Sequence, residues 1–153
     1  MAGHYLPLRE VIAMFRNILV PTDFTDKSLH AAKIALQLAG LHKAARLTLL
    51  HVIETIEGAE YDEFADFYEK LNKRAAGNMK KLVQSLGPEA SAAKTAIVFG
   101  KRAPEIVNFI NEHRVDLVVL GSHRIDPQEV PEGVGTISYK VGILSPCPVL
   151  MVK

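Results

Sequence analysis

The stretch Val115-Asp-Leu-Val-Val-Leu-Gly-Ser-His123 indicates the fold of this chain more clearly than any other. Its apolar run, Leu117 to Leu120, suits a strand that is covered on both faces, as strands of a parallel sheet are. Gly121 follows the run directly, where a glycine permits close approach of another backbone or a positive φ angle. We therefore predict a buried parallel strand that ends at a loop suited to ligand binding.

Similar apolar runs alternate with segments of helical period along the rest of the chain. The expected strands are 17–20, 47–52, 96–99, 115–120 and 149–152, and the expected helices are 27–41, 61–86, 104–113 and 136–144. This alternation predicts an α/β fold, with an open five-stranded parallel sheet flanked by helices and right-handed crossovers. Ligands on such sheets bind at the carboxyl ends of the strands, where the strand order reverses.

Length and composition restrict the kind of protein. The chain has 153 residues, which suits one domain, and we assign 1–14 to an N-terminal extension and 15–153 to the domain. Lys and Arg number 18 against 17 Asp and Glu, a balance that argues against a nucleic-acid or membrane-surface binder. No apolar run reaches the roughly 20 residues of a membrane helix. A single cysteine, Cys147, excludes an internal disulfide, and we expect a cytoplasmic protein.

Asp23 follows the first expected strand, where a ligand crevice would open. Its carboxylate can accept hydrogen bonds from a ribose hydroxyl or from an exocyclic amine. The alternative is that Asp23 caps the first helix. Asp26 and Ser28 are better placed for that role, which leaves Asp23 freer for a ligand.

A glycine cluster, Gly133-Val134-Gly135, precedes the last expected helix, which opens with Thr136-Ile137-Ser138. Backbone amides at a helix N-terminus, with hydroxyls beside them, form an anion site. The alternative is a flexible loop in which Thr136 is only the N-cap. The pattern alone leaves both interpretations open.

Four segments together resemble the universal stress protein family over nearly the whole chain. They are Ile18-Leu-Val-Pro-Thr-Asp-Phe24, Leu49-Leu-His-Val52, Val115 to His123, and Gly135-Thr-Ile-Ser138 with Ser145-Pro-Cys-Pro-Val-Leu-Met-Val-Lys153. The resemblance implies a Rossmann-like fold of the adenine nucleotide alpha hydrolase-like kind. It also implies a homodimer joined through the last strand, 148–153, and, in a subset of members, an ATP pocket.

The ATP-binding members carry a motif of Gly, two residues, Gly, nine residues, then Gly with Ser or Thr. Gly121 matches its first glycine and Gly135-Thr136 its last pair. Arg124 stands at the second glycine, and ten residues separate it from Gly135. A guanidinium at this position can clamp a phosphate, or its side chain can prevent the backbone shape of the loop. The site residues that the resemblance and the loops imply are Pro21, Thr22, Asp23, Val52, Leu120, Gly121, His123, Arg124, Gly135, Thr136, Ile137 and Ser138.

Three functions fit these features. The first is a regulatory homodimer of the stress response that binds ATP, with Mg²⁺ carried by the phosphates rather than by a protein cage. The second is a dimer that acts through unknown protein partners without a nucleotide. The third is a weak ATP hydrolase, for which no general base and no catalytic residue can be named. His51 is expected to be a packed residue of its strand, and His123 to be either a loop residue or a phosphate contact.

Overall fold

The computed structural model describes residues 14–124 and 136–153, together with 3, 6, 7 and 10. These residues form a five-stranded, wholly parallel sheet in the order β3-β2-β1-β4-β5. The strands are β1 (Asn17–Pro21), β2 (Arg46–Glu54), β3 (Lys94–Gly100), β4 (Leu117–Gly121) and β5 (Val149–Val152). The predicted α/β fold is confirmed.

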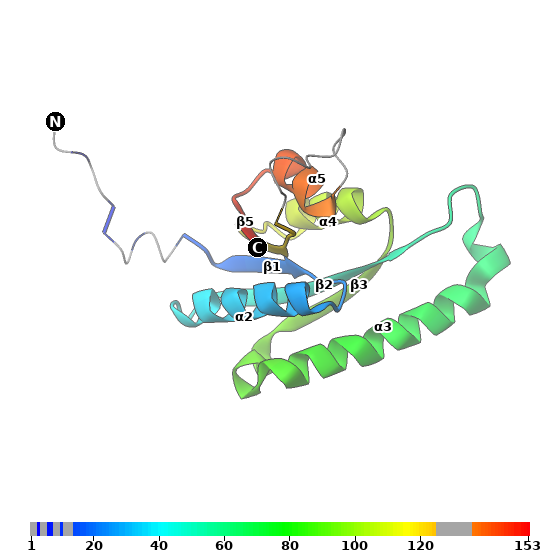
Figure 1. Ribbon diagram of the computed structural model, residues 1–153, viewed down its shortest axis with the longest axis horizontal. Helices are drawn as coiled ribbons and strands as arrows, with labels where there is room; N and C mark the ends of the chain where they lie inside the picture. The colour runs from blue at the N-terminus through cyan, green and yellow to red at the C-terminus, as the bar shows by residue number, and fades with distance from the viewer. Residues whose placement is uncertain (1–2, 4–5, 8–9, 11–13, 125–135) are drawn as a thin grey trace.

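Helices cover both faces of this sheet (Figure 1). One face carries α2 (Asp26–Gly40) and α3 (Ala65–Leu86), and the other carries α4 (Arg102–Glu112) and α5 (Ile137–Leu144). Because successive side chains of a strand point to opposite faces, each central strand contributes to two cores. Ile18 and Val20 pack towards α2, whereas Leu19 packs towards α4. This double burial explains why the central strands are continuously apolar.

Two short 3₁₀ helices, η1 (Tyr61–Phe64) and η2 (Pro88–Ala92), depart from the expected pattern. The apolar stripe from 61 to 86 predicts one helix, but its first turn is 3₁₀ and the α-helix begins at Ala65. Its predicted end is confirmed, because Gly87 has a φ of 88° and interrupts the helix after Leu86. The other helix boundaries lie within one or two residues of the expected ones.

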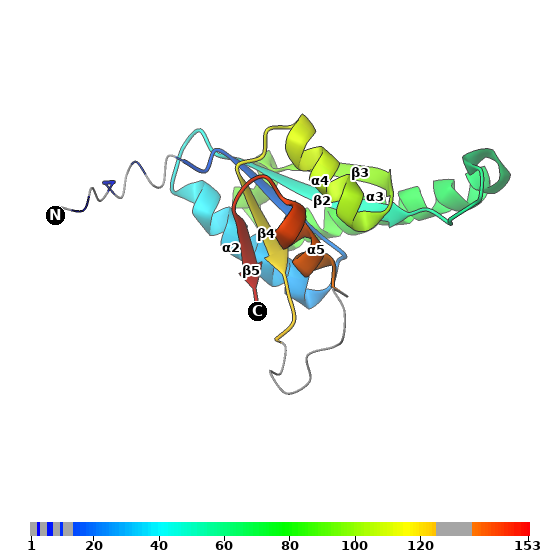
Figure 2. The same cartoon turned by 90° about the horizontal axis from the view of Figure 1, so that it is seen from above.

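The last strand, β5, lies at an edge of the sheet beside β4 (Figure 2). Leu150 and Met151 on this strand are each 40% exposed. Since an edge strand presents unpaired backbone groups, exposed apolar side chains beside them favour pairing with another chain. None of the helices in the described ranges combines the length and apolar character that crossing a bilayer requires.

Candidate functional site

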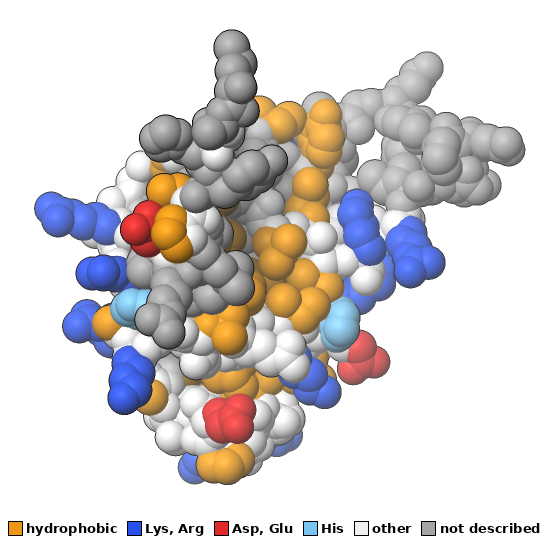
Figure 3. All heavy atoms as spheres, turned by 90° about the vertical axis from the view of Figure 1, so that its left-hand side faces the viewer, with side chains coloured by type: hydrophobic (Ala, Val, Ile, Leu, Met, Phe, Trp, Pro, Cys, Tyr) orange, Lys and Arg blue, Asp and Glu red, His pale blue; other side chains and the backbone are white. Residues whose placement is uncertain are grey.

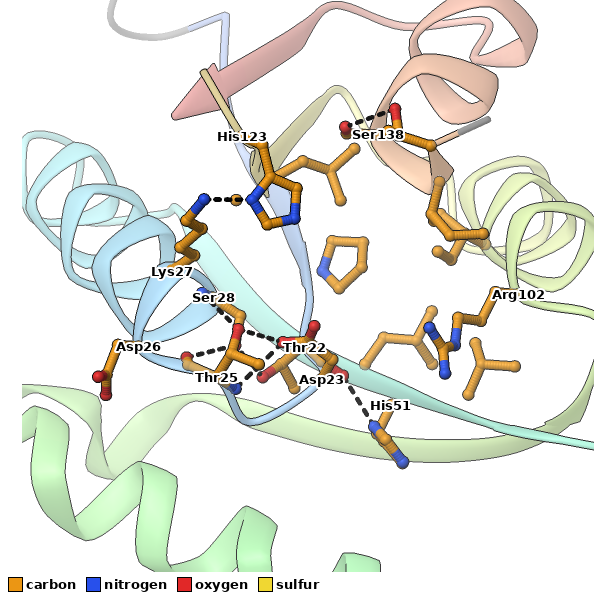
Figure 4. Close-up of a pocket in the computed structure, with 18 residues that line it drawn as sticks. Thr22, Asp23, Thr25, Asp26, Lys27, Ser28, His51, Arg102, His123 and Ser138 are labelled. Carbon is orange, nitrogen blue, oxygen red and sulfur yellow. Dashed lines mark hydrogen bonds between the residues drawn. The ribbon is translucent and has the colours of Figure 1, made fainter. Parts of the chain in front are cut away.

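A cavity of about 590 Å³ opens at the carboxyl ends of the strands. It lies beside the end of β1, which pairs with β2 on one side and with β4 on the other, so the strand order reverses there. This is the position where open α/β sheets bind ligands. The lining residues come from β1 and the loop after it, from β2, from β4, and from the first turns of α2, α4 and α5 (Figure 4).

An apolar wall forms one part of the cavity. Its members are Leu50, Val52, Ile106, Leu120 and Ile137. Leu50, Val52, Ile106 and Leu120 are buried in the core between the sheet and α4, and Ile137 packs against the same core. Because the core holds these side chains in place, the wall is a preformed surface, as apolar ligand pockets usually are. A planar, weakly polar group such as a nucleobase suits this wall.

Asp23 lies at the mouth of the cavity and is held by its own loop. Its Oδ1 accepts hydrogen bonds from the Thr25 backbone nitrogen at 3.1 Å and from Thr25 Oγ1 at 2.5 Å. Burial raises the pKa of Asp23, but the Thr25 and Ser28 hydrogen bonds outweigh it and leave the pKa below its ordinary value. Asp23 is therefore a carboxylate at neutral pH, and its second oxygen can accept from a ligand hydroxyl or amine.

The loop that carries Asp23 is fixed by unusual backbone geometry. Phe24 has a φ of 65°, which a bulky residue seldom adopts. Its backbone nitrogen donates to Thr22 Oγ1 at 3.1 Å, and its ring lies 4.4 Å from that of His51. His51 in turn contacts the Thr22 carbonyl oxygen through Nδ1 at 2.8 Å. The expected packing of His51 is confirmed, and these contacts hold the rim of the cavity.

Thr25, rather than Asp26 or Ser28, caps α2. Its side chain accepts from the Ser28 backbone nitrogen. The prediction that Asp26 and Ser28 are better placed as caps is wrong, because the turn closed by Asp23 brings Thr25 to the helix start. Ser28 is buried instead, and its hydroxyl donates to the Thr25 carbonyl oxygen at 2.9 Å and lies 3.0 Å from Thr22 Oγ1.

The opposite side of the cavity carries the N-terminus of α5. Thr136 is its N-cap and accepts from the Tyr139 backbone nitrogen at 3.3 Å, as one of the two sequence interpretations had it. Ser138 is buried, with its hydroxyl 3.1 Å from that of Ser122 and 3.4 Å from that of Thr136. Hydroxyls and helix amides gathered in this way suit an anionic group.

Gly121 is required by close packing. A Cβ on this residue would lie 2.8 Å from the carbonyl oxygen of Lys27 and 3.1 Å from the backbone nitrogen of Ser28. The sequence left two explanations for this glycine, close approach of another backbone or a positive φ angle. The structure shows the first, close backbone approach. The end of β4 therefore rests directly on the first turn of α2, which sets the distance between the two sides of the cavity.

The cavity contains most of the predicted site residues. Pro21, Thr22, Asp23, Val52, Leu120, Gly121, His123, Thr136, Ile137 and Ser138 all line it. Arg124 is exposed and is not among the lining residues. Gly135 lies outside the described residues, as do the ten residues between it and Arg124.

Sequence reasoning missed eight lining residues: Thr25, Asp26, Lys27, Ser28, Leu50, His51, Arg102 and Ile106. Most of them stand in the first turn of a helix or near the end of a strand. A prediction from every first helical turn, instead of from motif positions alone, would have included Asp26, Lys27, Ser28 and Arg102. Among the described residues, no group of three or more His, Cys, Asp or Glu side chains could hold a metal ion.

Comparison with known proteins decides the family. The family model described as the universal stress protein family matches residues 14–153. The chain belongs to the universal stress protein family. Universal stress protein YxiE of Bacillus subtilis is 32% identical, over 92% of this chain and 100% of its own length.

Solved structures of other proteins show the same fold. The structure of MJ0577, a universal stress protein of Methanocaldococcus jannaschii, matches with a TM-score of 0.75 and 32% identity, over 92% of this chain and 96% of that one. A universal stress protein solved in complex with cAMP matches with a TM-score of 0.66 and 22% identity, over 92% of this chain and 98% of that one. At that identity the second match bears on the fold alone.

Proposed function

We propose that this universal stress protein binds an adenine nucleotide, ATP in the first instance, in the cavity at the carboxyl ends of β1 and β4, and acts as a cytoplasmic regulatory homodimer of the stress response. The observation that carries the proposal is that one cavity has three chemically different parts. A buried apolar wall, an ionised Asp23 and a helix N-terminus with hydroxyls face the same space. A nucleotide presents the matching parts: a planar base, a ribose and phosphates.

The apolar wall and Asp23 suit the nucleoside part. The wall can cover a face of the base, while the Asp23 carboxylate can accept from a ribose hydroxyl or from the exocyclic amine of adenine. Ser138 and Thr136 at the start of α5 suit the phosphates. Mg²⁺ would arrive with the phosphates and keep most of its ligands from them and from water.

The homodimer is proposed through β5. Figure 3 views the left-hand side of Figure 1, on which β5 lies, and shows hydrophobic side chains gathered on the surface. The exposed apolar residues of α5 and β5 are Tyr139, Ile143, Leu144, Leu150 and Met151. Pairing with a second copy would cover these side chains and give hydrogen-bond partners to the unpaired backbone groups of β5. Sedimentation of wild type and Met151→Lys tests this, because a lysine there should dissociate the dimer; an unchanged dimer would move the interface elsewhere.

Thermal unfolding tests nucleotide binding. A ligand that is present at 100 times its dissociation constant stabilises the folded state by about 2.7 kcal/mol. For a domain of this size, that raises the melting temperature by roughly 5–10 °C. We expect this shift with Mg-ATP, a smaller one with GTP, and loss of most of it in Asp23→Ala. The matched control is Asp66→Ala, which changes an exposed acidic residue in the first turn of α3, away from the cavity.

A protein that unfolds at the same temperature with ATP, ADP, AMP and GTP would contradict the proposal. The second function, a dimer that works through protein partners without a nucleotide, would then be favoured by its exposed apolar edge. In that case Met151→Lys should abolish partner binding, while Asp23→Ala should leave it unchanged.

A further inference from the structure

Lys27 and His123 meet at the rim of the cavity, although 96 positions separate them in the sequence. Lys27 stands in the first turn of α2, and His123 follows β4 by two residues. Both line the cavity, and the ammonium Nζ of Lys27 contacts Nδ1 of the His123 ring (Figure 4). The close packing of Gly121 on the α2 backbone brings these two elements together.

This contact determines which ring nitrogen of His123 carries a proton. A lysine ammonium can only donate, so Nδ1 must accept, and the proton of the neutral ring then lies on Nε2. Figure 4 shows the second ring nitrogen directed into the cavity. His123 therefore presents an N–H donor to a ligand, and the tautomer follows from its hydrogen bond to Lys27.

The ammonium of Lys27 lies at the rim of the cavity. Within the described part of the chain, Lys27 forms no ion pair with a carboxylate. Its neighbour Asp26 points away from the middle of the cavity in Figure 4. A second ammonium reinforces the arrangement, because Lys153 donates to the His123 carbonyl oxygen at 3.2 Å and to Ser122 Oγ at 3.5 Å.

The cavity thus has two anion-binding parts. One is the start of α5, where the hydroxyls of Ser138 and Thr136 lie 3.4 Å apart. The other is the Lys27–His123 pair, which comes from different elements and lines the same cavity beside the end of β4 (Figure 4). A single phosphate can be satisfied by the first part alone, whereas a chain of phosphates can reach both.

We propose that Lys27 and His123 bind the phosphates beyond the first, and so make this chain selective for nucleoside di- and triphosphates over monophosphates. This inference rests on the proposed nucleotide site and specifies the class of nucleotide it takes. Lys27 supplies the charge, and His123, oriented by Lys27, supplies a neutral donor. A charge-assisted hydrogen bond at an exposed position corresponds to about a tenfold change in affinity.

The test is calorimetric titration of the full chain with ATP and with AMP, each with and without Mg²⁺. We expect wild type to bind ATP about tenfold more tightly than AMP. Lys27→Met should lower the affinity for ATP about tenfold and change the affinity for AMP by no more than about twofold, so that the selectivity for ATP disappears. Lys27→Arg should keep it, because the charge and the donors remain. Lys33→Met, an exposed lysine of the same helix outside the cavity, should change neither affinity.

His123 is tested by two further variants and one spectroscopic measurement. His123→Gln keeps a donor near the position of Nε2 and should keep most of the selectivity, whereas His123→Leu should lose it. Nitrogen-15 spectra of the ring should show the Nε2–H tautomer in wild type and a mixture in Lys27→Met. Melting temperatures of all variants within a few degrees of wild type establish that folding is intact.

The outcomes separate this inference from the function on which it rests. ATP and AMP could both bind, and Lys27→Met could lower the two affinities equally or leave both unchanged. Either result would overturn the Lys27–His123 inference and leave the nucleotide site in place. If a folded wild type binds no adenine nucleotide, both are overturned.

Discussion

The two ends of the sheet use polar groups differently. At the amino ends, Asp116 accepts from the backbone nitrogens of Arg16 at 2.8 Å and Asn17 at 3.0 Å, and the Asn17 side chain donates to the Arg114 carbonyl oxygen at 3.3 Å. At the carboxyl ends, the buried polar residues Thr22, Ser28 and Ser138 line the cavity, and the hydroxyl of a fourth, Ser122, lies 3.1 Å from that of Ser138.

We infer that this difference separates stability from the proposed ligand binding. Asp116 ties the start of β4 to the start of β1 and satisfies backbone donors that would otherwise need water. The hydroxyls at the carboxyl ends bond mostly to one another and to helix starts, so they shape the cavity wall and keep capacity to meet a ligand. We expect substitutions at the amino ends to change stability alone, and substitutions at the carboxyl ends to change ligand binding.

The largest effect is expected at Gly121, where the two roles meet. Gly121→Ala forces a Cβ to within 2.8 Å of the Lys27 carbonyl oxygen, and backbone must move to relieve it. Overpacking of this kind costs about 1–3 kcal/mol. Because the displaced turn carries Lys27 and Ser28, ATP binding should fall as well. Chemical denaturation and a nucleotide titration measure the two effects.

Gly77→Ala is the matched control. Nothing lies within 4 Å of a Cβ at Gly77, which stands inside α3. The substitution should stabilise the protein by about 0.4–1 kcal/mol and leave nucleotide binding unchanged. Equal stability of Gly121→Ala and wild type would show that α2 and β4 do not approach as closely as described.

An intermediate effect is expected at the amino ends. Asp116→Ala removes the acceptor of two backbone hydrogen bonds and should lower the free energy of unfolding by about 1–2 kcal/mol. Its affinity for ATP should equal that of wild type, because the cavity lies at the other end of the sheet. An Asp116→Ala protein that remains folded but binds ATP much more weakly would break the division between the two ends.

The smallest effect is a pH dependence at Asp23. The hydrogen bonds of Thr25 and Ser28 hold the folded-state pKa below its ordinary value of 3.8, so at pH values between the two the unfolded chain binds more protons. The stability that Asp23 adds is therefore present above pH 3.8, and it is lost as the pH falls through the lower pKa of the folded state.

Melting curves should be measured from about pH 5 to about pH 3. The difference in melting temperature between wild type and Asp23→Asn should become smaller as the pH falls. Asparagine keeps the acceptor for Thr25 but carries no charge. A difference that grows towards acid would mean that the folded-state pKa of Asp23 is raised instead.

The fold was predictable because it depends on local patterns. The apolar runs of β1 and β4 identify strands covered on both faces, and the alternation of strands and helices fixes the class. The helix starts were less predictable. Thr25 became the cap of α2 because Asp23 closes a turn just before it, and that turn depends on the conformation of Phe24. A sequence does not show which of several adjacent hydroxyls and carboxylates reaches the helix.

The lining of the cavity was predictable where motif residues lie at a strand end or just after one, as Gly121 and Asp23 do. Lys27 and Arg102 belong to no motif of the chain, and they reach the cavity because of how α2 and α4 pack on the sheet. The pairing of Lys27 with His123 depends on the close approach at Gly121, which is a three-dimensional distance. Side chains brought together by helix packing could not be found from spacing.

The most direct test of the account is equilibrium dialysis of the folded full chain against labelled Mg-ATP, with wild type, Asp116→Ala and Asp23→Ala in parallel. We predict one ATP per chain in wild type, the same affinity in Asp116→Ala, and about tenfold weaker binding in Asp23→Ala. If wild type retains no ATP, or if Asp116→Ala loses ATP while Asp23→Ala keeps it, the carboxyl-end cavity is not the nucleotide site.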